Sequence, residues 1–144
     1  MNLSFTRGDN PESVRENYRR ICTVLGIGPE QVVASMQTHT TNIRHVTKAD
    51  GGKGVVRPLD YQDVDGLITE EPGLALVCFY ADCVPLYFVD TAQKVIGLAH
   101  SGWRGTVRHM GGHMVRKMRE AFGSRPENLL VAIGPSICRD CYEV

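Results

Sequence analysis

The sequence has 144 residues, of which 42% are hydrophobic, enough for one globular domain that buries roughly two thirds of its unfolded surface. Sixteen basic and sixteen acidic residues balance to a formal charge of zero, which argues against a nucleic-acid-binding protein or one that binds anionic membranes. No apolar run reaches the roughly 18 residues of a membrane span, and the N-terminal residues lack the apolar stretch of a signal peptide, so we expect a cytoplasmic protein.

The first predicted element is a helix over residues 11–25. Asn10 supplies an N-cap and Pro11 a first-turn residue, and apolar residues then recur at helical spacing until Gly26. Cys22 falls on the apolar stripe of this helix, where a cysteine behaves as a small buried hydrophobic residue.

Two short strands are predicted next, over residues 31–36 and 43–47. His39 lies in the polar connection between them, where a histidine by itself is more often solvated than a ligand. The glycine-rich run 50–54 predicts a flexible loop, because it lacks the Gly-Lys-Ser/Thr ending of a phosphate-binding loop. A further short strand is predicted to end near Thr69, and Asp65 is interpreted as a residue that shapes its start.

Three apolar runs of strand length follow, at residues 74–80, 86–89 and 94–98, and their continuous hydrophobicity predicts burial on both faces. A helix is predicted from about 106 to 122, with methionines on its apolar stripe, and residues 129–133 predict another strand.

This succession predicts the fold class. We expect one α/β (or α+β) domain over residues 1–144, with a mixed β-sheet core, flanking helices and at least one right-handed βαβ crossover. Sites in such proteins are built at strand ends, which is where Cys83 and His100 are predicted to lie.

Cys83 and His100 stand in the runs Ala-Asp-Cys-Val-Pro and Ala-His-Ser-Gly-Trp-Arg-Gly. A cysteine and a histidine placed in this way act either as a nucleophile with its base or as two ligands of one metal. With His39 they would supply the three protein ligands of a catalytic zinc site, which keeps its fourth position open. Spacing alone does not show that the three converge.

Neighbouring residues have candidate roles of their own. The segment from Ser101 to Thr106 precedes the second long predicted helix, whose free N–H groups favour an anion, and Arg104 is placed to bind a phosphate. The alternative is a capping turn in which Trp103 packs. Asp82 is a candidate general acid or base, or a residue that orients a ligand histidine.

Several runs together resemble the laccase-like "polyphenol oxidase" family, now viewed as purine nucleoside phosphorylases. These are Gln37-Thr38-His39, Ala81 to Pro85, Ala99 to Thr106, Ile133 to Ile137, and Cys141 to Val144. The resemblance covers nearly the whole chain and implies that His39, Cys83 and His100 bind one catalytic zinc. Within these motifs we expect Asp82 and Arg104 to act in catalysis, and Gln37, Ser101, Gly102 and Thr106 to bind substrate.

The same resemblance implies an enzyme that phosphorolyses adenosine, inosine and methylthioadenosine and also deaminates adenosine. Its partners would be a purine nucleoside and phosphate, with the oligomeric state left open. The alternatives are an amide hydrolase with Cys83 as nucleophile and His100 as base, an editing factor for peptidoglycan precursors, and a copper-dependent phenol oxidase. Five histidines are too few for a multicopper oxidase, and the H-x-E with P-C-x-x-C signature of base deaminases is absent.

The remaining cysteines and the chain ends complete these expectations. The pair Cys138 and Cys141 is a weak zinc signal, because a structural site needs a second pair. An odd number of cysteines in a reducing compartment predicts thiols or ligands more than disulfides. The family domain extends beyond both ends of the chain, so we expect the N-terminal start and the C-terminal part of that domain to be missing.

Overall fold

The structure is a computed structural model that describes residues 1–143. Val144, the last residue of the Cys-Tyr-Glu-Val run, lies outside the described residues. The helices are α1 (Pro11–Leu25), α2 (Trp103–Val107) and α3 (Met110–Phe122), and the strands are β1 (Val32–Ala34), β2 (Ile43–His45), β3 (Gly66–Thr69), β4 (Ala75–Val77), β5 (Val84–Asp90), β6 (Val95–Ser101) and β7 (Leu129–Ile133).

A five-stranded sheet in the order β2-β3-β6-β5-β7 forms the centre of the fold, and β1 and β4 pair in parallel as a second, two-stranded sheet. Strand β2 is parallel to β3, whereas the other three pairs of the large sheet are antiparallel. Strands β6 and β7 are therefore parallel to each other, with α2 and α3 in the connection between them. The predicted mixed sheet and parallel crossover are confirmed.

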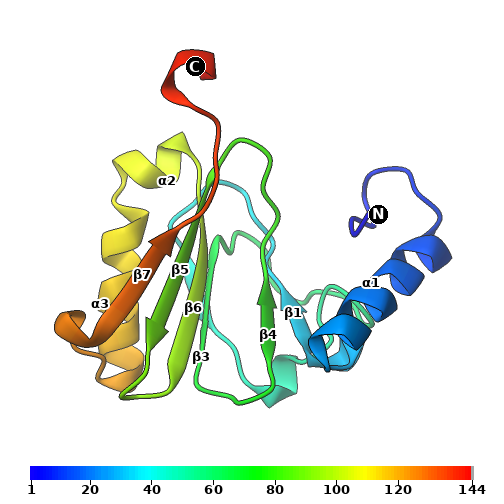
Figure 1. Cartoon of the computed structure of the whole chain (residues 1–144), viewed down its shortest axis with the longest axis horizontal. Helices are drawn as coiled ribbons and strands as arrows, with labels where there is room; N and C mark the ends of the chain where they lie inside the picture. The colour runs from blue at the N-terminus through cyan, green and yellow to red at the C-terminus, as the bar shows by residue number, and fades with distance from the viewer. Residues whose placement is uncertain (144) are drawn as a thin grey trace.

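The helices lie on opposite sides of the strands (Figure 1). Three buried methionines of α3 pack against one face of the large sheet, together with Ile68, Phe88, Val95 and Ala99. Helix α1 covers the small sheet, where its buried residues Val14, Tyr18 and Cys22 meet Val32 and Val55. A third cluster, which includes Val33 of β1 and Leu67 of β3, joins the two sheets.

Helix α1 has the limits and caps that its sequence predicts. The side-chain oxygen of Asn10 accepts a hydrogen bond from the N–H of Glu12 at 2.8 Å. Gly26 closes the helix in the left-handed conformation, with φ of 68°, which glycine adopts without the steric cost of a Cβ. Cys22 is buried as predicted.

The single helix predicted over residues 106–122 is wrong. The chain forms two helices, because His109 adopts a left-handed φ of 58° between α2 and α3 and so breaks the hydrogen-bonded ladder. The break separates α2 from α3. Within α3, Met110, Met114 and Met118 recur at helical spacing and face the sheet together, where all three are fully buried. Helix periodicity does not reveal a break of one residue.

The strand limits shift in a way that matters for the site. Strand β5 begins at Val84, immediately after Cys83, and β6 continues through His100 to Ser101 instead of ending at residue 98. At the N-terminal side, β1 and β4 are each shorter than predicted.

The prediction that the apolar strands are buried on both faces is also wrong. Helix α3 covers one face, but Tyr87, Val89 and Ile96 on the opposite face are 43%, 39% and 38% exposed. The small sheet packs over β3, and among residues 1–143 no element covers this part of β5 and β6. Apolar side chains on a strand show what it is able to bury, and the packing of neighbouring elements decides what it buries.

The loop 50–54 is not free to move as its glycines suggest. The carboxylate of Asp50, only 6% exposed, accepts hydrogen bonds from Lys53 at 2.7 Å, Arg44 at 3.1 Å and the N–H of Thr47 at 2.9 Å. Lys53 also pairs with Asp60 at 2.8 Å. A buried carboxylate is stable only with such partners, so the network fixes the loop.

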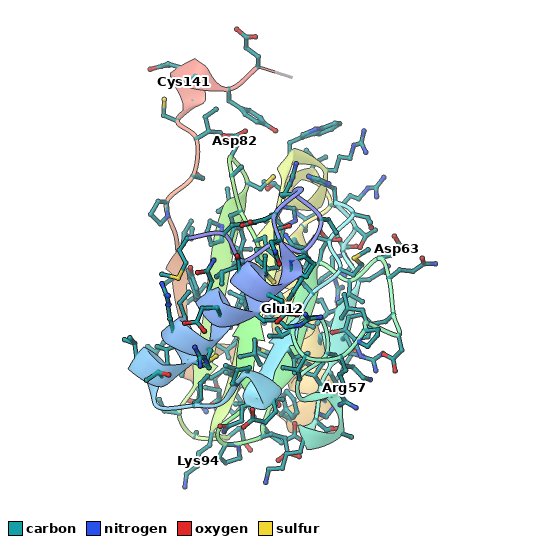
Figure 2. The ribbon with its side chains drawn as sticks, turned by 90° about the vertical axis from the view of Figure 1, so that its right-hand side faces the viewer. Glu12, Arg57, Asp63, Asp82, Lys94 and Cys141 are labelled. Atoms are coloured by element: carbon teal, nitrogen blue, oxygen red, sulfur yellow. The ribbon has the colours of Figure 1, made fainter. Side chains whose placement is uncertain are left out.

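The start of β5 and the end of β6 mark one end of the molecule. Asp82, in the loop before β5, and Cys141 lie at this end, opposite Lys94 (Figure 2). The backbone carbonyl of Asp82 accepts a hydrogen bond from the N–H of Ile137 at 3.1 Å, so the C-terminal segment contacts this loop. Within residues 1–143 no helix is both long and apolar enough to cross a membrane.

Candidate metal centre

The first element of the site is the loop that carries His39. This loop connects β1 to β2, and His39 has a left-handed φ of 65°. The backbone N–H groups of Thr38, His39 and Thr40 all donate to the carboxylate of Asp65, at 3.1, 3.1 and 2.8 Å. The loop is therefore wrapped around one buried carboxylate, and the His39 side chain is exposed above it.

Cys83 and His100 come to the same place through the register of the sheet. Strands β5 and β6 pair Pro85 with His100 and Val84 with Ser101, so Cys83 lies at the end of the sheet where β6 finishes. The sulfur of Cys83 lies 3.8 Å from Nε2 of His39. The rings of His39 and His100 meet edge to face, with 5.0 Å between their centroids.

The three predicted ligands do converge. One ligand atom from each of His39, Cys83 and His100 lies within 4.8 Å of the other two. Around a tetrahedral ion with bonds of about 2.0 to 2.3 Å, ligand atoms stand roughly 3.5 Å apart, so a small closure of the three side chains would hold the ion. Two imidazoles and one thiolate leave a fourth position open for water or substrate.

Gly102 provides an independent sign that space is reserved at this point. A Cβ added to Gly102 would lie 2.8 Å from Cδ2 of His39 and 3.0 Å from the sulfur of Cys83. The φ of Gly102 is −69°, so its backbone does not require glycine. The close approach of the two ligand side chains does, and the residues present therefore fit a bound metal ion.

Asp65 was missed as a site residue by sequence reasoning. Its carboxylate is fully buried and lies 2.8 Å from Nδ1 of His100. Burial alone would raise the pKa of this carboxyl, but the bonds from His100, Thr40 and Thr38 outweigh it and lower the pKa to about 2. In the sequence, the one sign of a role for Asp65 was that an acidic residue directly precedes a buried strand. Only the pairing of Gly66 with Ala99 shows that Asp65 stands next to His100.

The thiol of Cys83 is not activated by its surroundings. Burial raises its pKa, and the negative charges of Asp82 and Asp65 raise it further. In the absence of a cation the sulfur is therefore a protonated thiol at neutral pH, whereas a bound metal would stabilise the thiolate. This environment suits a metal ligand better than a free nucleophile.

A cavity of about 920 Å³ opens beside the three ligands. His39, Cys83, His100, Asp82 and Gln37 all contribute to its wall. The lining also includes apolar and aromatic residues and three arginines: Leu3, Phe5, Met36, Val56, Leu59, Phe79, Tyr80, Arg7, Arg15 and Arg57. Its size and mixed lining suit a small organic ligand with an anionic group.

Tyr80 is a further wall residue that sequence reasoning missed. Its ring lies 5.7 Å from the ring of His100, and its hydroxyl donates to the carbonyl of Ala99 at 3.1 Å. Burial raises the pKa of Tyr80, so the hydroxyl keeps its proton and remains a donor. The tyrosine therefore packs His100 from the cavity side.

Of the other predicted site residues, some line the cavity and some lie outside it. The amide of Gln37 bonds both backbone groups of Phe79, donating to its carbonyl and accepting from its N–H at 2.7 Å each. The hydroxyls of Ser101 and Thr106 pair with each other at 2.9 Å. Arg104 belongs to α2, and its guanidinium lies 5.3 Å from the centroid of the Trp103 ring. Ser101, Gly102, Arg104 and Thr106 are not among the residues that line the cavity, and their roles in catalysis or substrate binding stay predictions.

Comparison with known proteins shows the family of this chain. The model of the family described as multi-copper polyphenol oxidoreductase laccase matches residues 1–144. The chain belongs to this family. It is 40% identical over 145 residues to a protein of Geobacillus stearothermophilus named purine nucleoside phosphorylase YlmD, covering 100% of this chain and 53% of that protein.

Two solved structures share this fold. The crystal structure of YlmD from Geobacillus stearothermophilus aligns with a TM-score of 0.89 over 98% of this chain and 53% of its own. That of the hypothetical protein YfiH from Bacillus licheniformis, 34% identical, aligns with a TM-score of 0.92 over the same shares. The chain thus spans about half the length of the relatives that it matches.

Proposed function

We propose that this chain carries the metal centre of a purine nucleoside phosphorylase. The observation that best supports this proposal is the convergence of His39, Cys83 and His100 on the wall of a cavity large enough for a nucleoside. Relatives that bear the name purine nucleoside phosphorylase support the reaction class. The proposed substrates are adenosine, inosine and methylthioadenosine with phosphate, and deamination of adenosine is proposed as a second reaction at the same site.

Zinc is the metal that we propose. Two histidines and one cysteine with an open fourth position form a donor set that zinc accepts in catalytic sites. When bound, zinc would supply Lewis-acid polarisation of an oxygen of the phosphate or of the nucleoside. A multicopper oxidase needs further histidine clusters, and within residues 1–143 this trio is the one group of three or more possible ligands.

The chain's own residues would perform the remaining tasks. In phosphorolysis a phosphate oxygen forms a bond to C1′ of the sugar while the bond from C1′ to the purine nitrogen breaks, and its electron pair leaves with the base. Asp82, on the cavity wall next to Cys83, is the residue that we assign to proton transfer to the departing purine. The apolar wall around Phe79 and Tyr80 would hold the base and exclude water.

Phosphate also requires a cationic partner, and two sources are available. Arg104 follows from the sequence motif, whereas Arg7, Arg15 and Arg57 line the cavity. Arg57 already donates to the carbonyls of Ala49 and Gly51, and Arg15 pairs with Glu12. Arg7 is therefore the wall arginine that we assign to the phosphate.

The deciding experiment mixes the zinc-loaded protein with each nucleoside, with and without phosphate, and separates the products by chromatography. Phosphorolysis predicts free purine and a pentose 1-phosphate only when phosphate is present. Deamination predicts inosine from adenosine in either case. Metal-bound protein that releases no purine in the presence of phosphate would contradict the proposal.

One observation favours a second candidate, an amide hydrolase. The sulfur of Cys83 lies close enough to Nε2 of His39, at 3.8 Å, to resemble a nucleophile with its base. The raised pKa of the Cys83 thiol weakens this reading. Such a hydrolase would cleave an amide substrate without phosphate or metal and would be blocked by thiol alkylation, so an amide-cleavage assay on metal-free protein with and without alkylation separates the two reactions.

A further inference from the structure

The carboxylate of Asp65 is the most highly connected polar group at the site. It is fully buried and accepts five hydrogen bonds, all from residues that carry or flank the two ligand histidines. Oδ1 accepts from the N–H of His39 at 3.1 Å and lies 2.8 Å from Nδ1 of His100. Oδ2 accepts from the N–H of Thr38 at 3.1 Å and from the N–H and hydroxyl of Thr40 at 2.8 and 2.9 Å.

A single oxygen atom thus joins two ligands that are 61 positions apart in the chain. We propose that Asp65 is the positioning residue of the metal centre, which fixes the ring of His100 and the backbone of His39 at the same time. This inference rests on the proposed function, because it takes His39, Cys83 and His100 to be the metal ligands. Asp65 itself is not among the residues that line the cavity.

The first effect of Asp65 is on the tautomer of His100. An ionised carboxylate only accepts hydrogen bonds, so Nδ1 of His100 must carry the proton. The lone pair is then on Nε2, the nitrogen that remains for a metal. His100 also donates its backbone N–H to the carbonyl of Asp65 at 2.8 Å, so the two residues are joined through their backbones as well as their side chains.

The second effect is on the loop that presents His39. A left-handed φ is unfavourable for a residue with a Cβ, although histidine tolerates it better than most. The N–H groups before, at and after this bend all point to Asp65, so the carboxylate stabilises a conformation that the loop would otherwise leave. Removal of the negative charge would release His39 as well as His100.

The test compares Asp65→Asn with Asp63→Asn. The amide introduced at position 65 keeps the size of the side chain but turns one acceptor into a donor that faces N–H groups. Asp63 is the matched control, because its carboxylate accepts from the hydroxyl of Thr38 at 2.6 Å yet contacts neither histidine, and it lies at the surface (Figure 2). Circular dichroism and thermal unfolding would show whether each variant folds.

Two readouts separate positioning from general stability. Competition with a chelator measures zinc affinity, which we expect to fall about 10- to 100-fold in Asp65→Asn and to stay unchanged in Asp63→Asn. Absorption of the cobalt-substituted protein reports the ligand geometry, and we expect altered visible bands only in Asp65→Asn. Unchanged zinc affinity and cobalt bands in a folded Asp65→Asn protein would overturn the inference.

A third measurement needs no variant and no metal. Nitrogen-15 NMR of the unchanged metal-free protein reports the tautomer of each histidine, and we expect His100 to carry its proton on Nδ1. A proton on Nε2 would overturn the inference even if Asp65→Asn fails to fold. Conversely, a protein with the Nδ1–H tautomer that binds no zinc would count against the proposed function and not against the contact between Asp65 and His100.

Discussion

The sulfur of Cys83 lies 3.8 Å from Nε2 of His39, although the two residues are 44 positions apart in the chain. Ligand atoms on one tetrahedral zinc ion stand about 3.5 Å apart, so the fold brings these two side chains nearly to their binding distance. Their positions are fixed by two different sheets: Cys83 directly precedes β5, and His39 follows β1.

Gly102→Ala should weaken metal binding. The added methyl group would lie 2.8 Å from the ring of His39 and 3.0 Å from the sulfur of Cys83, so both ligands would have to move. We expect zinc affinity to fall about 10-fold or more, a loss comparable to that of an outer-shell contact, as measured by chelator competition. Gly105→Ala is the control, because its nearest neighbour is an ordinary 3.6 Å away. Equal zinc affinity in both variants would show that the metal is not held beside Gly102.

Asp82→Asn should abolish most turnover while zinc stays bound. Asp82 lines the cavity but is not one of the three ligands, so its loss removes proton transfer without removing the metal. We expect kcat for phosphorolysis to fall roughly 10²- to 10⁴-fold, with zinc content checked by metal analysis. Asp140→Asn, an exposed carboxylate outside the cavity, should leave kcat unchanged. Loss of zinc in Asp82→Asn would instead assign Asp82 to ligand orientation.

Two arginine variants should locate the phosphate. Arg7→Ala is expected to raise the phosphate KM about 10- to 100-fold, because a hydrogen bond to a charged group contributes roughly 1.5 to 3 kcal/mol and Arg7 lines the cavity. Arg104→Ala should change this KM much less, because Arg104 is not a wall residue and lies against Trp103. The opposite order, measured by initial rates at varied phosphate, would assign the phosphate to Arg104 as the sequence motif predicts.

Protonation of Asp50 should lower the stability of the protein in acid. Burial would raise the pKa of Asp50, but bonds from Lys53, Thr47 and Arg44 lower it from 3.8 to about 2. Because the folded protein has the lower pKa, the contribution is complete above about pH 5 and is lost progressively as the pH falls through 4 towards 2. The shift corresponds to about 2 kcal/mol at neutral pH.

Denaturant titration between pH 2 and 7 would check this. Asp50→Asn should lose that contribution at pH 7 and show a flatter dependence on acid than the unchanged protein. Asp60→Asn is the control, because Asp60 shares Lys53 but is 62% exposed, and its effect should be much smaller. A parallel pH dependence for Asp50→Asn and the unchanged protein would show that Asp50 titrates alike in the folded and unfolded chain.

Local chemistry in the sequence determined two elements with their exact limits: the helix from Pro11 to Leu25 and the strand from Leu129 to Ile133. In both cases the signals are short-ranged: a capping asparagine and a closing glycine for the helix, and a bounded apolar run for the strand. The three candidate ligands were also named from the sequence. A cysteine and two histidines could supply a metal site, and the family resemblance implied His39, Cys83 and His100 as that set.

Tertiary structure alone decided how these parts meet. The break at His109 comes from a left-handed φ of 58°, which the apolar spacing of residues 106–122 does not indicate. The exposed face of Tyr87, Val89 and Ile96 depends on which elements pack there, a property of neighbours and not of the strand.

The site shows the same division most clearly at Asp65. In the sequence it is one acidic residue before a short strand. In the fold, the pairing of β3 with β6 sets it beside His100, and the loop after β1 closes around it. Hydrogen bonds between residues that are 26 and 35 positions apart arise from strand register and loop closure, which leave no local mark on the chain.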